Sequence, residues 1–189
     1  VKDTDSGVNA GTIAVTVDGT VVSTVTKTAI DGGYKCTCTS PTLKDGSHTI
    51  SVKASDNDGN AAAAKTATFT VDTVPPTLQI TAPSNNLITN KKTVTVSGKT
   101  DDVSSKPVTV TVNGATVTVG TDGTFTKDVT LAEGANTITI VAKDKAGKTT
   151  TVTRKVTVDT SAPVIKSVTL TPNPVDCGKT FIIAVEITD

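Results

Sequence analysis

A short motif that occurs twice constrains this chain more than any other feature. Val-Asp-Thr, followed three residues later by Pro, is found at Val71–Pro76 and again at Val158–Pro163, about 87 residues further on. A self-similar segment at a fixed spacing is typical of tandem repeats, and a spacing near 90 residues suits a β-sandwich of about seven strands. The motif therefore predicts that one sandwich unit follows another along the chain.

Strand-forming residues dominate the sequence between the two motifs. Thr and Val are abundant, and both are β-branched, which favours strands over helices. Asn113-Gly114 and Asp122-Gly123 are turn signals that separate short alternating segments. About seven strands are expected over residues 73–159, which makes this segment a complete immunoglobulin-like sandwich, and the whole chain is expected to be all-β.

The two flanking segments repeat parts of this pattern. Val15–Gly19 matches Val110–Gly114, and Asp45–Ile50 matches Glu133–Ile138. Residues 1–72 are therefore expected to form a module that lacks its first strand or strands. Residues 160–189 supply the first two strands of a further module. Two strands bury no core of their own. This chain is therefore expected to be a window cut from a longer array, a subunit whose last strands are donated to a neighbouring copy, or a chain with a disordered head or tail.

Composition argues against several classes of function. The 18 basic and 18 acidic side chains cancel, so no electrostatic footprint for nucleic acid is expected. Aromatic residues make up 2% of the chain, which leaves few side chains for stacking on bases or sugars. No apolar run reaches the roughly 20 residues of a membrane-spanning helix, so no membrane insertion is expected.

Catalytic constellations are also missing from the sequence. His48 is the single histidine, and no Ser–His–Asp arrangement with a nucleophile motif can be assigned. Cys36 and Cys38 lie two residues apart in one expected strand, a spacing that suits a disulfide poorly. We therefore expect a protein that is not an enzyme.

These motifs resemble the bacterial immunoglobulin-like repeats of surface adhesins and secreted proteins. The resemblance rests on the Val-Asp-Thr-x-x-Pro joint, the Asn-Gly or Asp-Gly hairpin, the acidic residue and Gly before the sixth strand, and the Ala-x-Asp-x-x-Gly turn. It implies an extracellular location at the bacterial cell surface and a non-enzymatic role as stalk or spacer in an adhesin or surface fibre. Its partners would be neighbouring repeats of the same or another copy, with any host or cell-surface ligand bound by other domains. The alternatives are an accessory module of a secreted carbohydrate-active enzyme, or a phage or filament subunit assembled head to tail by strand donation.

Acidic residues are expected to gather at one pole of each module, because the entering joint and two of the loops meet there in an immunoglobulin-like topology. The candidate ligands are Asp72, Asp101, Asp102 and Asp144 for the middle module, Asp159 and Asp189 for the next, and Asp3, Asp5, Asp56 and Asp58 for the first. Ca²⁺ takes six to eight oxygen ligands in flexible geometry and would offset the repulsion between such carboxylates. The family resemblance also implies Ca²⁺ at joints between repeats. Turn formation is the other interpretation, because Asp and Gly favour tight turns without any metal.

Overall fold

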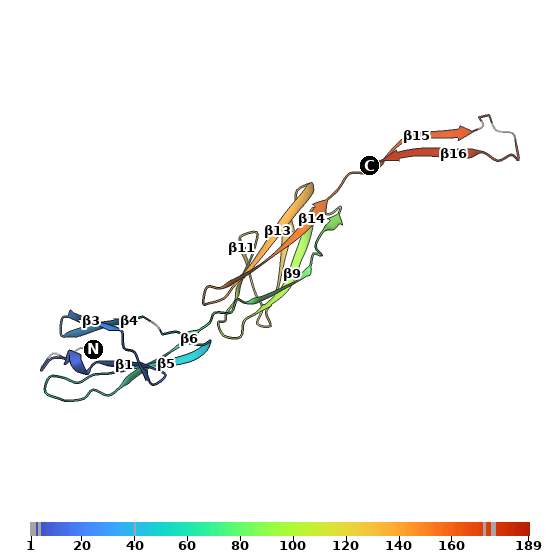
Figure 1. Cartoon of the computed structure of the whole chain (residues 1–189). Coiled ribbons are helices and arrows are strands. Elements are labelled where there is room, and N and C mark those ends of the chain that lie inside the picture. Colours follow the sequence, from blue (N-terminus) through green and yellow to red (C-terminus); the bar gives the residue numbers. More distant parts are fainter. Residues whose placement is uncertain (1–2, 4, 40, 172, 175–176) are drawn as a thin grey trace. The chain divides into compact units, whose positions relative to one another are not determined.

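The computed structural model describes residues 3, 5–39, 41–171, 173–174 and 177–189. Over these residues the fold is all-β, with a single 3₁₀ turn at Ala10–Thr12 and no α-helix (Figure 1). No helix in the described part of the chain has the length and apolar character needed to cross a membrane. Contacts group the chain into two compact units, one of residues 1–78, 100–110 and 141–151 and the other of residues 79–99, 111–140 and 152–189. This partition does not follow the repeats, so the domain boundaries given above stay predictions.

The N-terminal segment contains two antiparallel sheets. The larger sheet has the order β2-β1-β5-β6, and the smaller is the β3-β4 hairpin. The strands are β1 (Ala14–Val17), β2 (Thr20–Val21), β3 (Val25–Ile30), β4 (Gly33–Cys38), β5 (Gly46–Lys53) and β6 (Lys65–Val71). Val8, Ile13 and Ala54 form a small buried cluster, against which Tyr34 and Cys36 pack.

The middle segment contains eight strands in two sheets. The orders are β11-β10-β13-β14-β8 and β12-β9-β7. The strands are β7 (Thr77–Ala82), β8 (Leu87–Thr89), β9 (Thr93–Asp101), β10 (Thr109–Val112), β11 (Ala115–Val117), β12 (Thr124–Thr130), β13 (Gly134–Lys143) and β14 (Thr149–Val158). The sequence predicted about seven; the additional strand is β8, three residues long, which pairs in parallel with the end of β14.

Alternation along these strands builds the core of the middle segment. Successive side chains of a strand point to opposite faces, so every second residue can be buried. The Val, Ile, Ala and Phe side chains with at most 3% exposure are Val96, Val110, Val112, Phe125, Ile138, Ile140, Ala142, Val156 and Val158. Each large aliphatic or aromatic member contributes roughly 1.5–3 kcal/mol by leaving water, which makes this the best-formed core of the chain.

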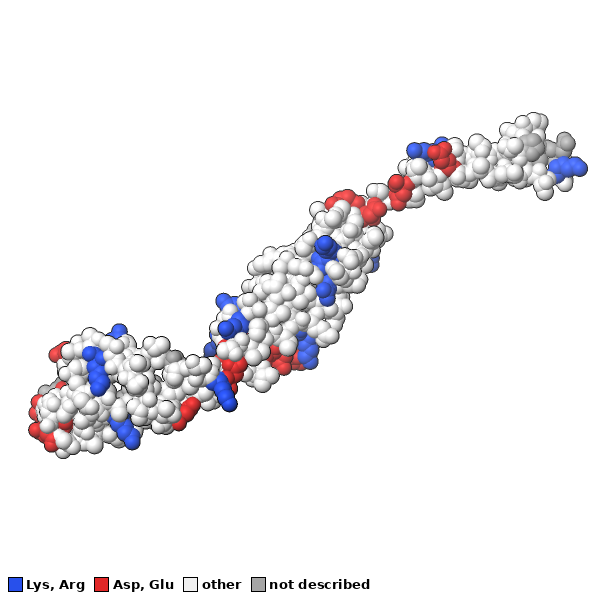
Figure 2. Space-filling view, viewed as in Figure 1, with Lys and Arg blue, Asp and Glu red and all other residues white. Residues whose placement is uncertain are grey.

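The C-terminal segment is a two-stranded antiparallel hairpin of β15 (Val164–Thr171) and β16 (Ile182–Thr188). Its side chains are exposed along almost its whole length. Lys and Arg are scattered over the surface visible in Figure 2 and do not gather into a basic patch there. Cys36, Cys38 and Cys177 are free thiols.

A candidate metal centre built from three buried aspartates

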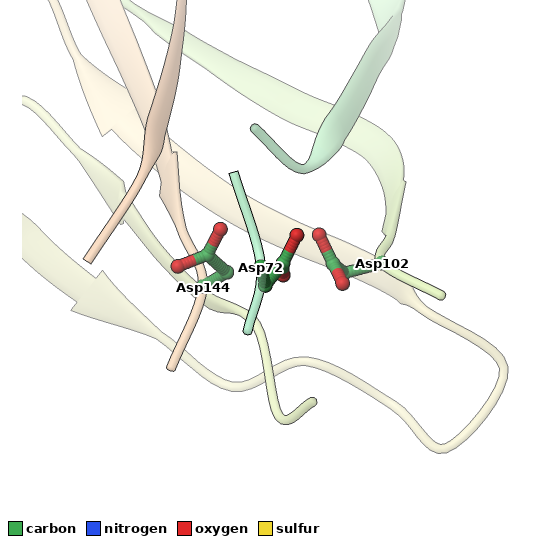
Figure 3. A group of neighbouring side chains, drawn as sticks. All are labelled: Asp72, Asp102 and Asp144. Atoms are coloured by element: carbon green, nitrogen blue, oxygen red, sulfur yellow. The ribbon is translucent and has the colours of Figure 1, made fainter. Parts of the chain in front are cut away.

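Three carboxylates from distant parts of the sequence meet in one place. Asp72 directly follows β6, Asp102 follows β9 and Asp144 follows β13 (Figure 3). Strand alternation explains the two last positions. Thr100 and Asp102 continue the inward-facing series of β9, and Asp144 continues that of β13 after Ala142.

The three side chains are close together and shielded from water. One oxygen of each carboxylate lies within 4.8 Å of an oxygen of the other two. Asp72, Asp102 and Asp144 are 8%, 6% and 5% exposed. Three like charges at this separation repel one another where water is scarce, and a cation between them would offset this repulsion.

Turn hydrogen bonds use one oxygen of each carboxylate. Oδ1 of Asp72 accepts from the Val74 N–H at 3.1 Å, and Oδ1 of Asp144 accepts from the Lys148 N–H at 2.8 Å. Oδ1 of Asp102 accepts from the N–H groups two and three residues later, at 2.8 and 2.7 Å. These bonds fix the direction of the side chains, as turn-forming aspartates do.

The second oxygens of the carboxylates bear on the choice between a metal site and simple turn formation. Oδ2 of Asp72 accepts a hydrogen bond from the hydroxyl of Ser105, a residue that is itself buried. Oδ2 of Asp144 is buried and has no hydrogen-bond partner. Within the described residues, neither Asp72, Asp102 nor Asp144 forms an ion pair. A buried, unsatisfied carboxylate oxygen is costly, and a cation at this point would satisfy it.

The donor set fits Ca²⁺. Oxygens that each lie about 2.4 Å from one ion are at most about 4.8 Å apart, and the three carboxylate oxygens all lie within 4.8 Å of one another. The ligands are all hard carboxylate oxygens, and none is a thiolate or an imidazole, which zinc would favour. Three carboxylates leave room for backbone carbonyls or water to complete the six to eight ligands of calcium.

Asp101 is not part of this cluster, although the sequence placed it there. It is exposed on the opposite face of β9 from Asp102, and its Oδ1 lies 2.8 Å from Nζ of Lys106. Adjacent residues of a strand point in opposite directions, so only one of the two aspartates can face the cluster. The sequence could have separated them by extending the alternation of β9 one residue further.

The first module contains two carboxylates in corresponding positions. Asp3 accepts from the N–H of Asp5 and from the hydroxyl of Ser6, both at 3.1 Å, as Asp102 does from the residues that follow it. Asp56 accepts from the N–H of Asn60 at 2.7 Å, as Asp144 does from Lys148. Asp3 and Asp56 line one cavity of about 280 Å³, whereas Asp5 and Asp58 are exposed.

One amide distinguishes this pair from the buried cluster. The Asn60 side chain donates to Oδ2 of Asp56 at 2.7 Å, and this hydrogen bond lowers the pKa of Asp56 below its ordinary value. Lys148 occupies the corresponding place beside Asp144, where Oδ2 has no partner. No three-carboxylate group other than Asp72, Asp102 and Asp144 occurs among the described residues. The last two predicted ligands, Asp159 and Asp189, are both exposed, and Asp159 accepts from the Ser161 N–H at 3.0 Å.

A second acidic position, which the sequence analysis gave only as part of the repeat motif, binds the Thr of each Val-Asp-Thr joint. Oε1 of Glu133 accepts from the N–H of Thr160 and Oε2 from its hydroxyl, both at 2.8 Å. Asp45 accepts from the N–H and hydroxyl of Thr73 at 3.1 and 3.0 Å. The Thr of each Val-Asp-Thr motif thus donates hydrogen bonds to the acidic residue that directly precedes β5 or β13. The signal was present in the sequence, because the two acid–Gly pairs recur in step with the two motifs.

The sandwich sheets and the repeated joint define a class, that of tandem immunoglobulin-like β-sandwich proteins. Comparison with known families identifies it further. Residues 3–73 match the bacterial Ig-like domain and residues 76–160 match domain B of glucodextranase. These two matches support the resemblance of the chain to bacterial immunoglobulin-like repeats.

Individual relatives are more distant. Bacillopeptidase F of Bacillus subtilis (strain 168) is 34% identical over 140 residues, which are 74% of this chain but 9% of that protein. The fibronectin(III)-like modules of Clostridium thermocellum CbhA are 18% identical, cover 84% of this chain and 82% of theirs, and give a TM-score of 0.47. A tetra-tandem repeat from the extending region of a large adhesion protein is 23% identical, covers 98% of this chain and 57% of that one, and gives a TM-score of 0.39.

Proposed function

We propose that this chain is a non-enzymatic spacer of an extracellular bacterial surface protein, and that Ca²⁺ bound by Asp72, Asp102 and Asp144 stiffens the joint after β6. One observation carries the calcium part: three mutually close, buried carboxylates include an oxygen, Oδ2 of Asp144, that nothing in the described chain satisfies. A cation at this point ties the Val-Asp-Thr joint to the turns after β9 and β13, because each segment supplies one ligand. The joint would then resist bending, as a spacer requires.

A specific observation favours a second candidate, an accessory module of a carbohydrate-active enzyme. Residues 76–160 match domain B of glucodextranase. A glycan-binding face needs exposed aromatic side chains, whereas Phe125 is 3% exposed and Tyr34 and Phe69 are partly buried. Phe181 is the single aromatic residue of the described chain that is well exposed, at 50%. We therefore favour the spacer, and binding of the chain to a glycan array would reverse that preference.

Calcium titration tests the proposal directly. Isothermal calorimetry on the 189-residue chain is expected to show Ca²⁺ binding, and calcium at about 100 times Kd is expected to raise the free energy of unfolding by about 2.7 kcal/mol. Asp144→Asn is expected to abolish binding, yet to leave the protein at least as stable in EDTA, because it removes one of three repelling charges. Asp101→Asn is the matched control, since this neighbour of Asp102 faces away from the cluster.

The contrary result is equally clear. If the wild-type chain takes up no calcium, and its melting temperature is the same in calcium and in EDTA, the cluster is not a calcium site. Binding that survives Asp144→Asn but is lost in Asp101→Asn would place the ion elsewhere.

A further inference from the structure

Arg154 is a charged residue on the core-facing side of β14. The inward positions of this strand are Val152, Arg154, Val156 and Val158, and the last two are each 1% exposed. Arg154 itself is half-buried. A guanidinium that leaves water without hydrogen-bond partners is costly, so the partners of this side chain show why it is tolerated here.

The guanidinium of Arg154 reaches from one sheet of the middle sandwich to the other. Its Nε donates to the Pro83 carbonyl oxygen at 3.1 Å, and its Nη2 donates to the Ile80 carbonyl oxygen at 3.2 Å. Its Nη1 donates to the carbonyl oxygen of the preceding residue, Thr153, at 3.2 Å. β14 belongs to the five-stranded sheet, whereas β7, which contains Ile80, belongs to the three-stranded sheet. One side chain thus connects the two sheets.

The Ile80 carbonyl group lies at an open edge of its sheet. β7 is the last strand in the order β12-β9-β7, so one of its sides has no neighbour among the described strands of that sheet. The Gln79 carbonyl oxygen points to β9, because a Cβ atom on Gly98 of β9 would lie 2.5 Å from it. Successive carbonyl groups of a strand point to opposite sides, so that of Ile80 points to the open edge. Arg154 therefore binds an acceptor that the ladder of β7 and β9 leaves unpaired.

Residues 83–86, which we call the crossover, carry the chain from the sheet of β7 to the sheet of β14. β8 follows the crossover and pairs in parallel with β14. Asn85 of the crossover also binds β14, since its Oδ1 accepts from the Lys155 N–H at 2.9 Å. Beyond the end of β14, the Asp159 N–H donates to the Thr89 carbonyl oxygen of β8 at 2.9 Å. Contacts to β14 therefore extend along the whole segment from the crossover to the end of β8.

We propose that Arg154 holds the crossover against β14, and that this contact keeps β8 paired with β14. Two hydrogen bonds join its guanidinium to β7 and to the first residue of the crossover. The guanidinium is a rigid planar fork, so it also fixes the direction in which the chain leaves β7. The contact lies within one sandwich, and it depends neither on calcium nor on a role as a spacer.

The ladder between β8 and β14 needs such support because it is short. Three residues of β8 pair with β14. Each ordered residue loses backbone entropy, and three residues of a parallel pair gain few hydrogen bonds in return. Hydrogen bonds donated by a charged group are roughly twice as strong as those between neutral groups. The two bonds from Arg154 therefore offset part of the entropy that is lost when β8 is ordered.

β8 also covers an edge of the larger sheet. It is the last strand in the order β11-β10-β13-β14-β8, where it lies next to β14. Release of β8 would leave backbone groups of β14 unpaired along that edge, and an unpaired edge can pair with a strand of another molecule. Arg154 is therefore placed to suppress edge pairing of β14 as well as to retain β8.

Amide hydrogen exchange followed by NMR tests the role of Arg154 in the 189-residue chain. The Asp159 N–H reports on β8, because its acceptor is the Thr89 carbonyl oxygen. Arg154→Met keeps an aliphatic side chain at this position and removes the donors, and the Asp159 amide is then expected to exchange about 10–100 times faster than in wild type. Lys155→Met is the matched control, since Lys155 is the next residue of β14 and points to the other face. In this control the exchange of Asp159 is expected to stay within about twofold of wild type.

Urea separates release of β8 from loosening of the whole sandwich. Opening of β8 alone exposes little surface, so the faster exchange of Asp159 in Arg154→Met is expected to change little at low urea concentrations. Exchange of the Ile140 amide in the core strand β13 requires global unfolding and is expected to rise steeply with urea. A urea dependence of Asp159 as steep as that of Ile140 would assign the effect to global stability and overturn the proposal.

A measurement on the wild-type chain tests the contact itself and does not depend on a variant that folds. The sequence contains one arginine, so the Nε–H signal of Arg154 is identified without further assignment. Donation to the Pro83 carbonyl oxygen is expected to slow exchange of this proton with water by at least about tenfold relative to free arginine. An Nε–H that exchanges as fast as in free arginine, or an Asp159 amide that exchanges as slowly in Arg154→Met as in wild type, would contradict the proposal.

Discussion

Gly98 shows how tightly single residues are fixed in the middle sandwich. It lies on the inward face of β9, where a Cβ atom would come within 2.5 Å of the Gln79 carbonyl oxygen and 2.7 Å of Cζ of Phe125. Gly98→Ala is expected to lower the free energy of unfolding by about 1–3 kcal/mol, because the backbone of β7 or the Phe125 ring must move. Chemical denaturation measures this.

Ser97→Ala is the control for that substitution, since Ser97 is the preceding residue of β9 and points to the other face. It is expected to change stability by no more than about 0.5 kcal/mol. Equal losses in the two variants would show that the close approach at Gly98 is not what limits the strand.

At the candidate metal centre, the sequence alone predicted some of the residues and missed others. Asp72, Asp102 and Asp144 were all among the candidates, because strand ends and turns could be placed from alternation and Gly signals. Ser105 was not, since a serine in a loop carries no periodic signal for the direction of its hydroxyl. Asp3 and Asp56 line one cavity. The spacing of the sequence does not show that the Asn60 side chain donates a hydrogen bond to Oδ2 of Asp56.

At the scale of the elements, each Val-Asp-Thr joint forms hydrogen bonds to one acidic residue, Asp45 or Glu133. Hydrogen bonds from the backbone and then the hydroxyl of Thr160 lower the pKa of Glu133. A group with a depressed folded-state pKa contributes stability above its unfolded pKa and loses that contribution as pH falls through the folded value. The Glu133–Thr160 contact is therefore expected to persist below pH 4.5, the ordinary pKa of a glutamate, and to break at still lower pH.

Glu133→Gln provides the test of this contact at neutral pH. An amide side chain offers one acceptor oxygen in place of two, so the Thr160 N–H is expected to exchange with solvent faster than in wild type. Hydrogen exchange followed by NMR measures the rate. Glu186→Gln is the control, because Glu186 lies on the exposed hairpin face; unchanged Thr160 exchange in Glu133→Gln would show that the carboxylate does not hold the joint.

The positions of the strands were easier to predict from the sequence than the pairing between strands. Alternating Thr and Val placed most of the strands, because the side-chain period of two is written directly in the sequence. β8 was not predicted from the sequence, because three residues are too few to show a period and its parallel partner β14 lies about 70 residues away. The sheet order β12-β9-β7 likewise depends on contacts between segments that no local pattern encodes.

For the whole molecule, the two sandwiches are expected to respond differently to pH. His48 Nδ1 lies 2.6 Å from Oδ2 of Asp18 and Nε2 lies 2.8 Å from the Lys44 carbonyl oxygen, so only the doubly protonated ring can donate to both. The Asp18 hydrogen bond, then that of Lys44, raises the pKa of His48. The middle module has Asn136 at the corresponding position, and it does not titrate.

A group whose pKa is raised on folding contributes its full stability below the pKa of the unfolded state, which is about 6.5 for His48. That contribution is lost as the pH rises through the pKa of the folded state. The N-terminal module is therefore expected to melt at a lower temperature as pH rises above 6.5, while the middle module shows no such step. NMR melting curves for residues of each module measure this. The double variant His48→Asn, Asp18→Asn copies the middle module and is expected to remove the step; a step that remains would assign it to another group.

The parallel pairing of β8 with β14 has a mechanical consequence for a chain under tension. Leu87, Ile88 and Thr89 are in register with Val156, Thr157 and Val158, near the exit of the sandwich. A tensile load that enters through β7 and leaves through β14 pulls these two strands along their length in opposite senses. The backbone hydrogen bonds between them must then break together instead of one after another, so this short strand raises the force needed to extend the module.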